Sequence, residues 1–494
     1  MSNRNSGGPF KGGPKKPASH KPGKLGQKPR AGKADEKPFA FETDDRPRLS
    51  QPRREKQAQP LNDMRLGEFT IDRMGHDGRG ITAWNGKTLF VEGALVGERI
   101  SARLVRDHAR YAEGRLDKLL ESSSERLAPD CKHYAECGGC QLQHWQPQQQ
   151  IVFKQKAVLE QLELWGGVKP KHVLPPIISP TQGYRRCARL GTFYGEEGVT
   201  LGFRQRNSNQ LVAIRDCTVL APELNCLLAP LTQWLERLES SKAVTHIELI
   251  HTETQTTVIL RHTKALAVED LDSLHALCAK WHFSAWLQGD DKVLTDLQGA
   301  PADPRLVYSL VDFDLELGFH PLDFVQVNSS VNARMVAQAL QLLSLKGAER
   351  VLDLFCGIGN FTLPIAQHCA EVIGIEAVET MVERGRENAA RAGLANAQFI
   401  AANLLTLSQN RLRATCGKID AVLLDPPRDG AKEIIDKLPQ LSPKRIVYVS
   451  CNPATLARDA KVLVAAGYQL DSVGVLDMFP HTAHVESMAL FVRK

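Results

Sequence analysis

A thiol that could act as a nucleophile follows a short apolar run near the end of this 494-residue chain. Residues 446–449 are all β-branched or aromatic, which predicts a buried strand. Pro453 must end that strand, because proline cannot donate to a sheet ladder. Cys451 therefore lies at the carboxyl end of a strand, where open α/β sheets bind their ligands. A lone cysteine is also often a small buried hydrophobe, so its role depends on the other motifs.

Two carboxylates, like Cys451, lie next to the end of a predicted strand. Asp425 opens an Asp-Pro-Pro-Arg segment directly after the apolar run 421–424, which makes a rigid corner with one carboxylate aimed at a cleft. Glu486 precedes the predicted closing strand 487–492. His481 and His484 come just before it, but a lone histidine is more often structural than a base. We therefore rank both histidines below Glu486 as proton acceptors.

The last 170 residues or so alternate strand and helix, which is typical of a doubly wound parallel sheet. A strand at 351–355 runs into Cys-Gly-Ile-Gly-Asn-Phe, a glycine-bearing turn that enters a helix. The next strand ends at Glu376, 19 residues past Gly357, a spacing that suits an acid gripping a pair of ribose hydroxyls. No Lys-Ser/Thr pair follows the turn, which argues against a nucleoside triphosphatase.

A second cysteine pattern predicts a metal centre. Cys131, Cys137 and Cys140 form a Cys-x5-Cys-x2-Cys run. The sequence shows no secretory signal and no apolar run long enough to span a membrane, so we expect a reducing cytoplasmic setting without disulfides. A fourth ligand is needed, and the candidates are Cys187, Cys217 and Cys226. Four thiolates suit zinc or an iron–sulfur cluster, and the three-plus-one spacing favours a [4Fe–4S] cluster.

Basic charge is concentrated at the N-terminus. Residues 1–60 hold 15 Lys or Arg and 6 Asp or Glu, a net +9, whereas the whole chain carries +6. This segment is rich in Gly and Pro and poor in apolar residues, so we expect a disordered tail. It is either a salt-sensitive arm for nucleic acid or a solubilising extension.

Residues 61–121 predict a small five-stranded β-barrel, with Asn85-Gly86 as its clearest hairpin turn. Basic loops on such a barrel suit oligonucleotide binding, and a structural β cap is the alternative. Residues 122–320 predict a mixed α+β domain. Arginines interleaved with aromatic residues there could follow phosphates and stack bases, or form a solvated strand face. The arginines are Arg185, Arg186, Arg189, Arg204 and Arg206.

Taken together, the motifs resemble those of the S-adenosylmethionine-dependent RNA uracil-C5-methyltransferases. They are Phe324-Val325-Gln326-Val327-Asn328, the segment 353–361, Asp425-Pro426-Pro427-Arg428, Ser450-Cys451-Asn452-Pro453 and His484-Val485-Glu486. A TRAM-like barrel and a cysteine cluster resemble the branch that modifies large-subunit ribosomal RNA at the site called uridine 1939. The tail at 1–60 departs from the compact family pattern.

The resemblance implies a Rossmann-like, seven-stranded methyltransferase domain at 321–494. Before it would come the tail (1–60), an OB-like TRAM barrel (61–121) and a central α+β domain (122–320). Cys451 would be the nucleophile and Glu486 the base. The donor and uracil pocket would be lined by Gln326, Phe355, Asn360, Glu376, Asn403 and Asp425. A [4Fe–4S] cluster would be bound by Cys131, Cys137, Cys140 and Cys217.

The expected cofactors are S-adenosyl-L-methionine and the [4Fe–4S] cluster, and the expected partner is 23S ribosomal RNA. We also expect a cytoplasmic monomer that binds no membrane. Alternatives are the same chemistry on another rRNA or tRNA uridine, or a non-catalytic RNA-binding assembly factor. A radical methyltransferase usually has Cys-x3-Cys-x2-Cys, a shorter first gap. Amino-directed adenine methyltransferases usually carry an aromatic residue after Pro-Pro, where this chain has Arg428.

Overall fold

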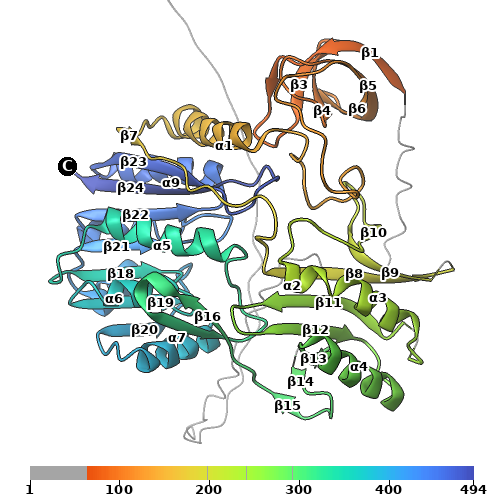
Figure 1. Cartoon of the computed structure of the whole chain (residues 1–494). Helices are drawn as coiled ribbons and strands as arrows, with labels where there is room; N and C mark the ends of the chain where they lie inside the picture. Colours follow the sequence, from red (N-terminus) through yellow and green to blue (C-terminus); the bar gives the residue numbers. More distant parts are fainter. Residues whose placement is uncertain (1–63, 197, 241, 292) are drawn as a thin grey trace, which may run out of the picture. The chain divides into compact units, whose positions relative to one another are not determined.

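The computed structural model describes residues 64–196, 198–240, 242–291 and 293–494. The predictions for the tail at 1–60 lie outside these ranges. Within them the strands form one six-stranded sheet, two eight-stranded sheets and a two-stranded hairpin (Figure 1). No helix in the described ranges is long and apolar enough to cross a membrane.

The first sheet curls around a small apolar core that includes Leu89, Val91 and Ile100. Its strands are β1 (Arg65–Thr70), β2 (Arg73–Met74), β3 (Gly80–Trp84), β4 (Lys87–Glu92), β5 (Arg99–Asp107) and β6 (Tyr111–Glu121). They lie in the order β1-β5-β6-β4-β3-β2. The hairpin turn is confirmed, since Asn85 and Gly86 join β3 to β4 with φ of 48° and 75°.

The prediction of five strands is wrong, because the sheet has six, and β2 has only two residues. The alternation of β6 is also weak, because its inward positions include Ala112 and Gly114, which are too small to give an apolar pattern. The irregular pairing of β6 with β5, which contains several bulges, weakens the period of two further.

The second sheet belongs to the central region. Its strands are β8 (Cys187–Gly195), β9 (Gly198–Arg204), β10 (Leu211–Ala213), β11 (Val244–His251), β12 (Thr256–His262), β13 (Ser284–Gln288), β14 (Leu294–Thr295) and β15 (Pro301–Ala302). The helices beside it are α2 (Pro222–Asn225), α3 (Leu228–Glu236) and α4 (Val268–Trp281). The helical stretch 222–236 is divided into α2 and α3, because Pro230 has no N–H to donate to the carbonyl of Cys226.

The third sheet confirms the doubly wound prediction. Its strands are β18 (Arg350–Leu354), β19 (Glu371–Glu376), β20 (Ala397–Ala401), β21 (Ala421–Leu424), β22 (Arg445–Ser450), β23 (Tyr468–Leu476), β24 (Glu486–Arg493) and β7 (His172–Val173). The order is β20-β19-β18-β21-β22-β24-β23-β7, and β24 runs antiparallel to both neighbours. The sequence predicted seven strands, and the sheet has eight. The strand that was missed is β7, which has only two residues and so no detectable apolar period.

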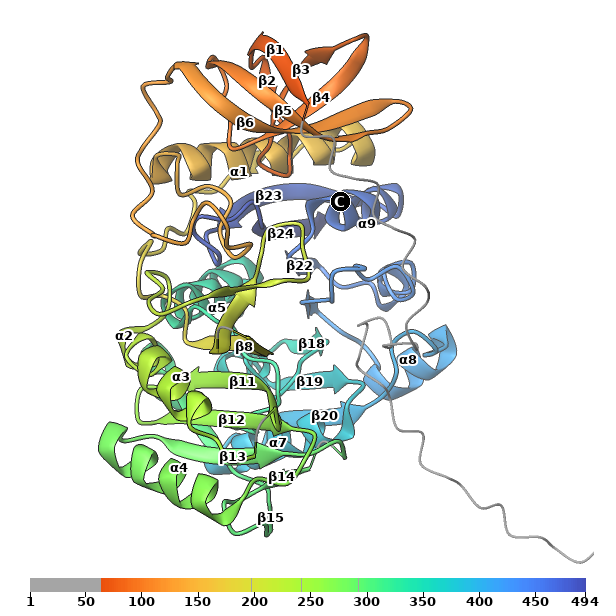
Figure 2. The same ribbon diagram turned by 90° about the vertical axis from the view of Figure 1, so that its right-hand side faces the viewer.

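Helices cover both faces of this sheet. They are α5 (Ser329–Leu343), α6 (Thr362–Ala366), α7 (Glu379–Arg391), α8 (Gln409–Cys416) and α9 (Pro453–Ala465). Side chains of β22 alternate between two cores: Tyr448 packs with α9, and Val447 packs with α5. The earlier helix α1 (Pro147–Gln161) continues into a π-helical turn, η1 (Leu162–Gly166), and contacts α9 and β23 (Figure 2).

A two-stranded hairpin links the central region to the third sheet. It consists of β16 (Leu306–Leu310) and β17 (Leu315–Phe319). Tyr308 and Phe319 from this hairpin are buried in a core that also contains Leu363 and Phe399, two side chains that pack against Gly359 of the turn after β18. The hairpin therefore supports the edge at which the predicted donor pocket lies.

Candidate active site and cysteine-lined cavity

The pairing of β22 with β24 brings the predicted nucleophile and base to one edge. Ser450 is the register partner of Ser487, and the Ser487 hydroxyl donates to the Ser450 carbonyl at 3.2 Å. Cys451 directly follows β22, and Glu486 is the first residue of β24. The two side chains therefore leave the sheet at the same edge. Glu486 is buried, whereas Cys451 is partly exposed.

A small hydrogen-bonded turn fixes the backbone around the thiol. Asn452 caps α9, with its Oδ1 accepting from the Ala454 amide at 3.1 Å. The Asn452 Nδ2 donates to the Arg428 carbonyl at 3.0 Å. Its backbone amide donates to the Ser450 hydroxyl at 3.2 Å. The nucleophile candidate and the Asp-Pro-Pro-Arg segment are therefore held together by one side chain.

The local charges oppose ionisation of the thiol. Burial raises the pKa of Cys451 to about 11, and the neighbouring Glu486 and Asp425 carboxylates contribute to the rise, whereas Arg428 opposes it. Burial also raises the pKa of Glu486 well above its usual value, and that of Asp425 to about 7. At neutral pH the Cys451 thiol is therefore protonated, and Arg428 is a nearby cation that favours its thiolate.

A cavity of about 250 Å³ opens at this edge. Cys451, Arg428 and His484 line it from the third sheet, and Trp165 lines it from η1. His484 has a pKa below its usual value, chiefly because it is desolvated and also because Arg428 is near, so it is a neutral ring at pH 7. The cavity therefore offers a thiol, a cation and aromatic surface within one small space.

The glycine turn after β18 has an unusual backbone. Phe355, Gly357 and Gly359 have φ of 62°, 55° and 100°, and Phe355 is the one residue of the three for which this conformation is strained. The Gly357 amide donates to Glu376 Oε2 at 3.3 Å, and Glu376 Oε1 accepts from the Ala377 amide at 2.7 Å. The turn and the acid at the end of β19 are thus in direct contact, as a nucleotide-type site requires.

Asp353, at the start of this turn, has one unsatisfied oxygen. Its Oδ2 accepts from the Thr362 hydroxyl at 2.6 Å. Its Oδ1 is buried and has no hydrogen-bond partner within the described part of the chain. Burial raises the pKa of Asp353 to about 7. A buried polar atom left without a partner indicates a position where a ligand or water donates.

The predicted pocket residues fall along one edge. Phe355, Glu376, Asn403 and Asp425 end or follow β18, β19, β20 and β21, which are hydrogen-bonded neighbours in the sheet. Asn403 Oδ1 accepts from the Leu405 amide at 2.9 Å, so this side chain is held by its own loop. Their roles in binding stay predictions.

Asn360 and Gln326 are tied to partners that the sequence did not reveal. The Asn360 amide exchanges two 2.9 Å hydrogen bonds with Asn332, and its Oδ1 also accepts from the Tyr308 hydroxyl at 2.9 Å. The Gln326 carbonyl accepts from Arg186 Nε at 2.9 Å. Tyr308 and Arg186 come from the hairpin and the second sheet, and no motif spacing connects them to the glycine turn.

The arginine run predicted as a possible phosphate track divides into buried and surface groups. Arg186 is buried, stacks over the Tyr308 ring at 4.7 Å and positions the 324–328 segment. Arg189 pairs with Glu248 at 3.3 Å, and Arg206 pairs with Glu92 at 3.0 Å. Arg204 is exposed and bonds to Asn209. Some of these arginines therefore stabilise the fold, and others lie at the surface.

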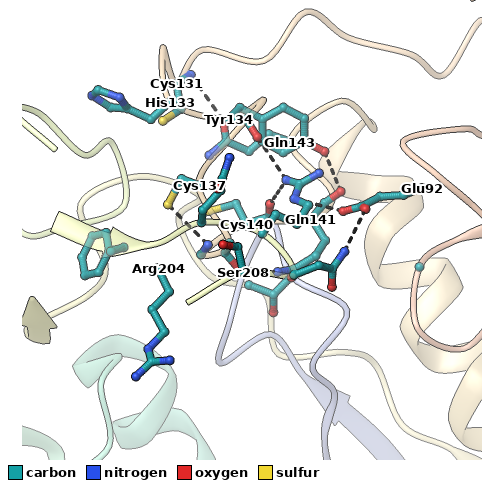
Figure 3. A pocket seen from close by; sticks show the side chains of 18 of the residues that line it. Glu92, Cys131, His133, Tyr134, Cys137, Cys140, Gln141, Gln143, Arg204 and Ser208 are labelled. Carbon is teal, nitrogen blue, oxygen red and sulfur yellow. Dashed lines mark hydrogen bonds and ion pairs between the residues drawn. The ribbon is translucent and has the colours of Figure 1, made fainter. Parts of the chain in front are cut away.

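Four cysteines line a second, larger cavity of about 1110 Å³, and Figure 3 labels three of them, Cys131, Cys137 and Cys140. They are Cys131, Cys137, Cys140 and Cys217. Burial raises the pKa of Cys140 to about 12, and the other three thiols contribute to the rise. The Gly139 amide donates to Cys137 Sγ at 3.4 Å. Cys187 and Cys226, the other candidates for the fourth ligand, are described residues that lie outside this lining.

The described ranges contain no group of three or more His, Cys, Asp or Glu arranged to hold a single metal ion. The four thiols share a cavity without forming such a group. The same cavity reaches the catalytic edge, since Arg428 and His484 line it as well as the smaller one.

The cysteine loop is bonded to the segment that leads into β24. The His481 carbonyl accepts from the Gln141 and Leu142 amides, both at 2.8 Å, and His481 has φ of 63°. The His481 amide donates to Gln150 Oε1 at 3.0 Å. On the same segment, Lys154 Nζ donates to Asp477 Oδ1 at 2.8 Å, a fully buried ion pair. Helix α1 and the cysteine loop thus fix the approach to Glu486.

Comparison with known proteins supplies the family. Residues 175–494 match the family model described as tRNA (Uracil-5-)-methyltransferase. The chain is 44% identical to the 23S rRNA (uracil(1939)-C(5))-methyltransferase RlmD of Alkalilimnicola ehrlichii, over 86% of this chain and 96% of that protein. It is also 44% identical to the RlmD of Pseudomonas putida, over 85% of this chain and 92% of the relative.

A solved structure agrees with these matches. The tRNA (uracil-54, C5)-methyltransferase of Pyrococcus abyssi, in complex with S-adenosyl-L-homocysteine, has 25% identity and a TM-score of 0.66, covering 86% of this chain and all of that one. The class defined by the fold and the matched segment is a methyltransferase with a doubly wound sheet. The chain belongs to the tRNA (uracil-5-)-methyltransferase family.

The charges at the thiol predict a specific pH dependence. Because the pKa of Cys451 is about 11, its alkylation by iodoacetamide should rise about tenfold per pH unit from pH 7 to pH 10. Arg428→Met removes a cation that favours the thiolate, so alkylation at any one pH should slow. Lys432→Met, which removes an exposed cation from the same segment, should leave the rate unchanged. Mass spectrometry of the Cys451 peptide measures the rate, and a plateau below pH 9 would contradict the account.

Proposed function

We propose that this chain transfers the methyl group of S-adenosyl-L-methionine to C5 of a uridine in 23S ribosomal RNA, at the position called 1939. The observation that carries the proposal is the meeting of Cys451 and Glu486 at one edge of a sheet that also presents a glycine turn and an acid. The RlmD relatives, 44% identical over most of the chain, support ribosomal RNA as the substrate.

The residues of the turn fit a methyl donor of this kind. Glu376 can accept from ribose hydroxyls, and the unsatisfied Asp353 Oδ1 can accept one further hydrogen bond. Phe355, with its strained backbone, presents an aromatic side chain beside the turn. The donor supplies an electrophilic methyl group. We further propose that Gln326, Asn360, Asn403 and Asp425 complete the donor and uracil pocket.

The chemistry requires a nucleophile and a base. C5 of uracil is a poor nucleophile, so the Cys451 thiol first loses its proton to solvent and its sulfur bonds to C6, while the electron pair of the C5–C6 double bond moves to make C5 an enolate carbon. C5 then bonds to the methyl carbon as the bond from that carbon to the sulfonium sulfur of the donor breaks, and C5 still bears its hydrogen. Glu486 removes that proton, the double bond re-forms, and the C6–S bond breaks to release the thiolate. The target base is splayed out of its RNA stack to reach the thiol.

The larger cavity suits the RNA strand around the target. Arg204 exposes a cation there, and Arg185 and Arg428 line the wall that leads to the catalytic edge. Arg79 and Arg106 line it beyond these, and they pair there with Asp77 and Glu113. Cations along a path favour a phosphate backbone. We propose that residues 61–121 are a TRAM-like RNA-binding module, residues 122–320 a central domain and residues 321–494 the methyltransferase domain.

We also propose that Cys131, Cys137, Cys140 and Cys217 bind a [4Fe–4S] cluster. Four thiols in one cavity are the donor set that such a cluster takes. A four-iron cluster is bound at its corners, so its sulfur ligands lie farther apart than those of one zinc ion. The cluster would be structural, because all four corners would be filled.

The catalytic roles predict two different failures. With labelled donor and 23S rRNA fragments, the wild-type enzyme should label one uridine, and mapping identifies it. Cys451→Ala should abolish transfer while leaving donor binding intact, because no C6 adduct can form. Glu486→Gln should stall after methylation, since the C5 proton has no acceptor. A methyl-labelled protein–RNA band should then persist on a denaturing gel and be absent from the double variant.

Normal turnover by Glu486→Gln would move the base role to another group, with His481 or His484 next. Full activity of Cys451→Ala would remove the nucleophile and favour an amino-directed methyltransferase. A label at another rRNA uridine or in tRNA would keep the chemistry and change the substrate. Binding of RNA with no label in any of them would favour an assembly factor.

The cluster proposal predicts the composition of the purified protein. Prepared without oxygen, it should be brown and contain iron and sulfide in near-equal amounts. Cys217→Ala should lose most of both, because it removes a ligand from the cavity. Cys226→Ala, which changes an exposed cysteine outside the cavity lining, should keep both. Stoichiometric zinc without sulfide would contradict the cluster and leave a zinc site instead.

A further inference from the structure

An aromatic side chain that the proposed mechanism does not use lines the cavity of the thiol. Trp165, in the η1 turn, is 57% exposed and lines the same 250 Å³ cavity as Cys451. A large aromatic residue with more than half of its surface in water is unusual unless that surface has a partner. Its neighbour Leu164 is 76% exposed and lies outside the cavity lining among the described residues.

The turn that carries Trp165 is fixed relative to the thiol. Gly166 lies so close to α9 that a Cβ there would be 2.8 Å from the Ala457 carbonyl. Leu162, at the start of the turn, is fully buried in the core that it shares with α9. Helix α9 begins at Pro453, two residues after Cys451. The close packing therefore gives the backbone that carries Trp165 a set position near the nucleophile.

The rest of the cavity has the character of a nucleic-acid contact. Arg428 contributes a cation, and His76 and His484 contribute further rings. Gln161, at the end of α1, contributes an amide that can bond to a base edge. A cation with several rings is the combination that binds an unpaired nucleotide, through its phosphate and through the face of its base.

The sheet order separates this cavity from the donor turn. The donor turn follows β18, which lies two strands from β22, with β21 between them. Helix α1 contacts β23, which lies on the other side of the thiol, and η1 contacts α1 and α9. A uracil placed between the donor turn and Cys451 therefore leaves the Trp165 side of the thiol for the adjoining RNA.

We propose that Trp165 stacks on the base of a nucleotide next to the target uridine. The proposal rests on the proposed function, because it takes the target base to lie at Cys451. Extruding the target removes stacking from its neighbours, and an indole face replaces that stacking for one of them. Trp165 is therefore a positioning residue that holds the RNA strand while the uracil is at the thiol.

The test uses 23S rRNA fragments with 2-aminopurine placed, one at a time, at the nucleotides that flank the modified uridine. The wild-type enzyme should quench the 2-aminopurine at one flanking position by stacking. Trp165→Ala should lose that quenching and raise KM for RNA about tenfold, with kcat within about twofold, since stacking aids binding without taking part in bond making. Trp165→Phe should restore most of both.

Leu164→Ala is the matched control, and it should behave as wild type because that side chain lies outside the cavity. A second measurement avoids the alanine variant, in case it folds poorly. RNA binding should quench more tryptophan emission in the wild type, which has six tryptophans, than in Trp165→Phe. Equal quenching in both, with unchanged 2-aminopurine signals and KM in Trp165→Ala, would overturn the proposal and leave the indole to a different occupant.

These readouts separate the inference from the proposed function. If RNA binds with the Trp165-dependent quenching but no uridine is methylated, the stacking role stands and the proposed activity fails. If a uridine is methylated and every flanking 2-aminopurine responds equally in wild type and Trp165→Ala, the activity stands and the stacking role fails.

Discussion

The antiparallel insertion of β24 between β22 and β23 is the constraint on which the candidate site depends. It sets Ser487 opposite Ser450. Cys451, the residue after Ser450, and Glu486, the residue before Ser487, therefore lie together at the catalytic edge of the sheet. Side chains alternate along a strand, so a slip of one residue would send every buried side chain of β24 to the opposite face. The apolar residues of β24, which pack into both cores, therefore fix the position of its carboxylate.

The segment before β24 has no sheet pairing of its own and is held by distant parts of the chain. Lys154 and Gln150 bind it from α1, the cysteine loop donates two amides to His481, and the Tyr184 hydroxyl donates to Pro480. Removing one partner of a buried ion pair such as Lys154–Asp477 costs about 3–5 kcal/mol. The central region thus contributes directly to the order of the catalytic edge, which gives the cysteine loop a physical connection to Glu486.

Much of this arrangement could be predicted because it depends on local sequence patterns. The strands 351–355 and 446–449, the Asn85-Gly86 turn and the doubly wound sheet follow from periodicity and turn chemistry. Short elements such as β7 could not be predicted, and neither could β6, whose inward positions include small residues. Contacts across the fold left no local signal: the Asn332–Asn360 amide pair, the Lys154–Asp477 ion pair and the place of Trp165 all depend on tertiary packing.

The central claim is that the Cys451 sulfur bonds to the uracil ring that receives the methyl group. An RNA fragment with 5-fluorouridine at the target site tests it most directly, because fluorine at C5 cannot be removed as a proton and the adduct cannot break down. After digestion, mass spectrometry should find the peptide that contains Cys451 linked to a methylated 5-fluorouridine nucleotide. A stable adduct on another cysteine, or methylation of a normal RNA with no adduct formed from the fluorinated one, would contradict the account.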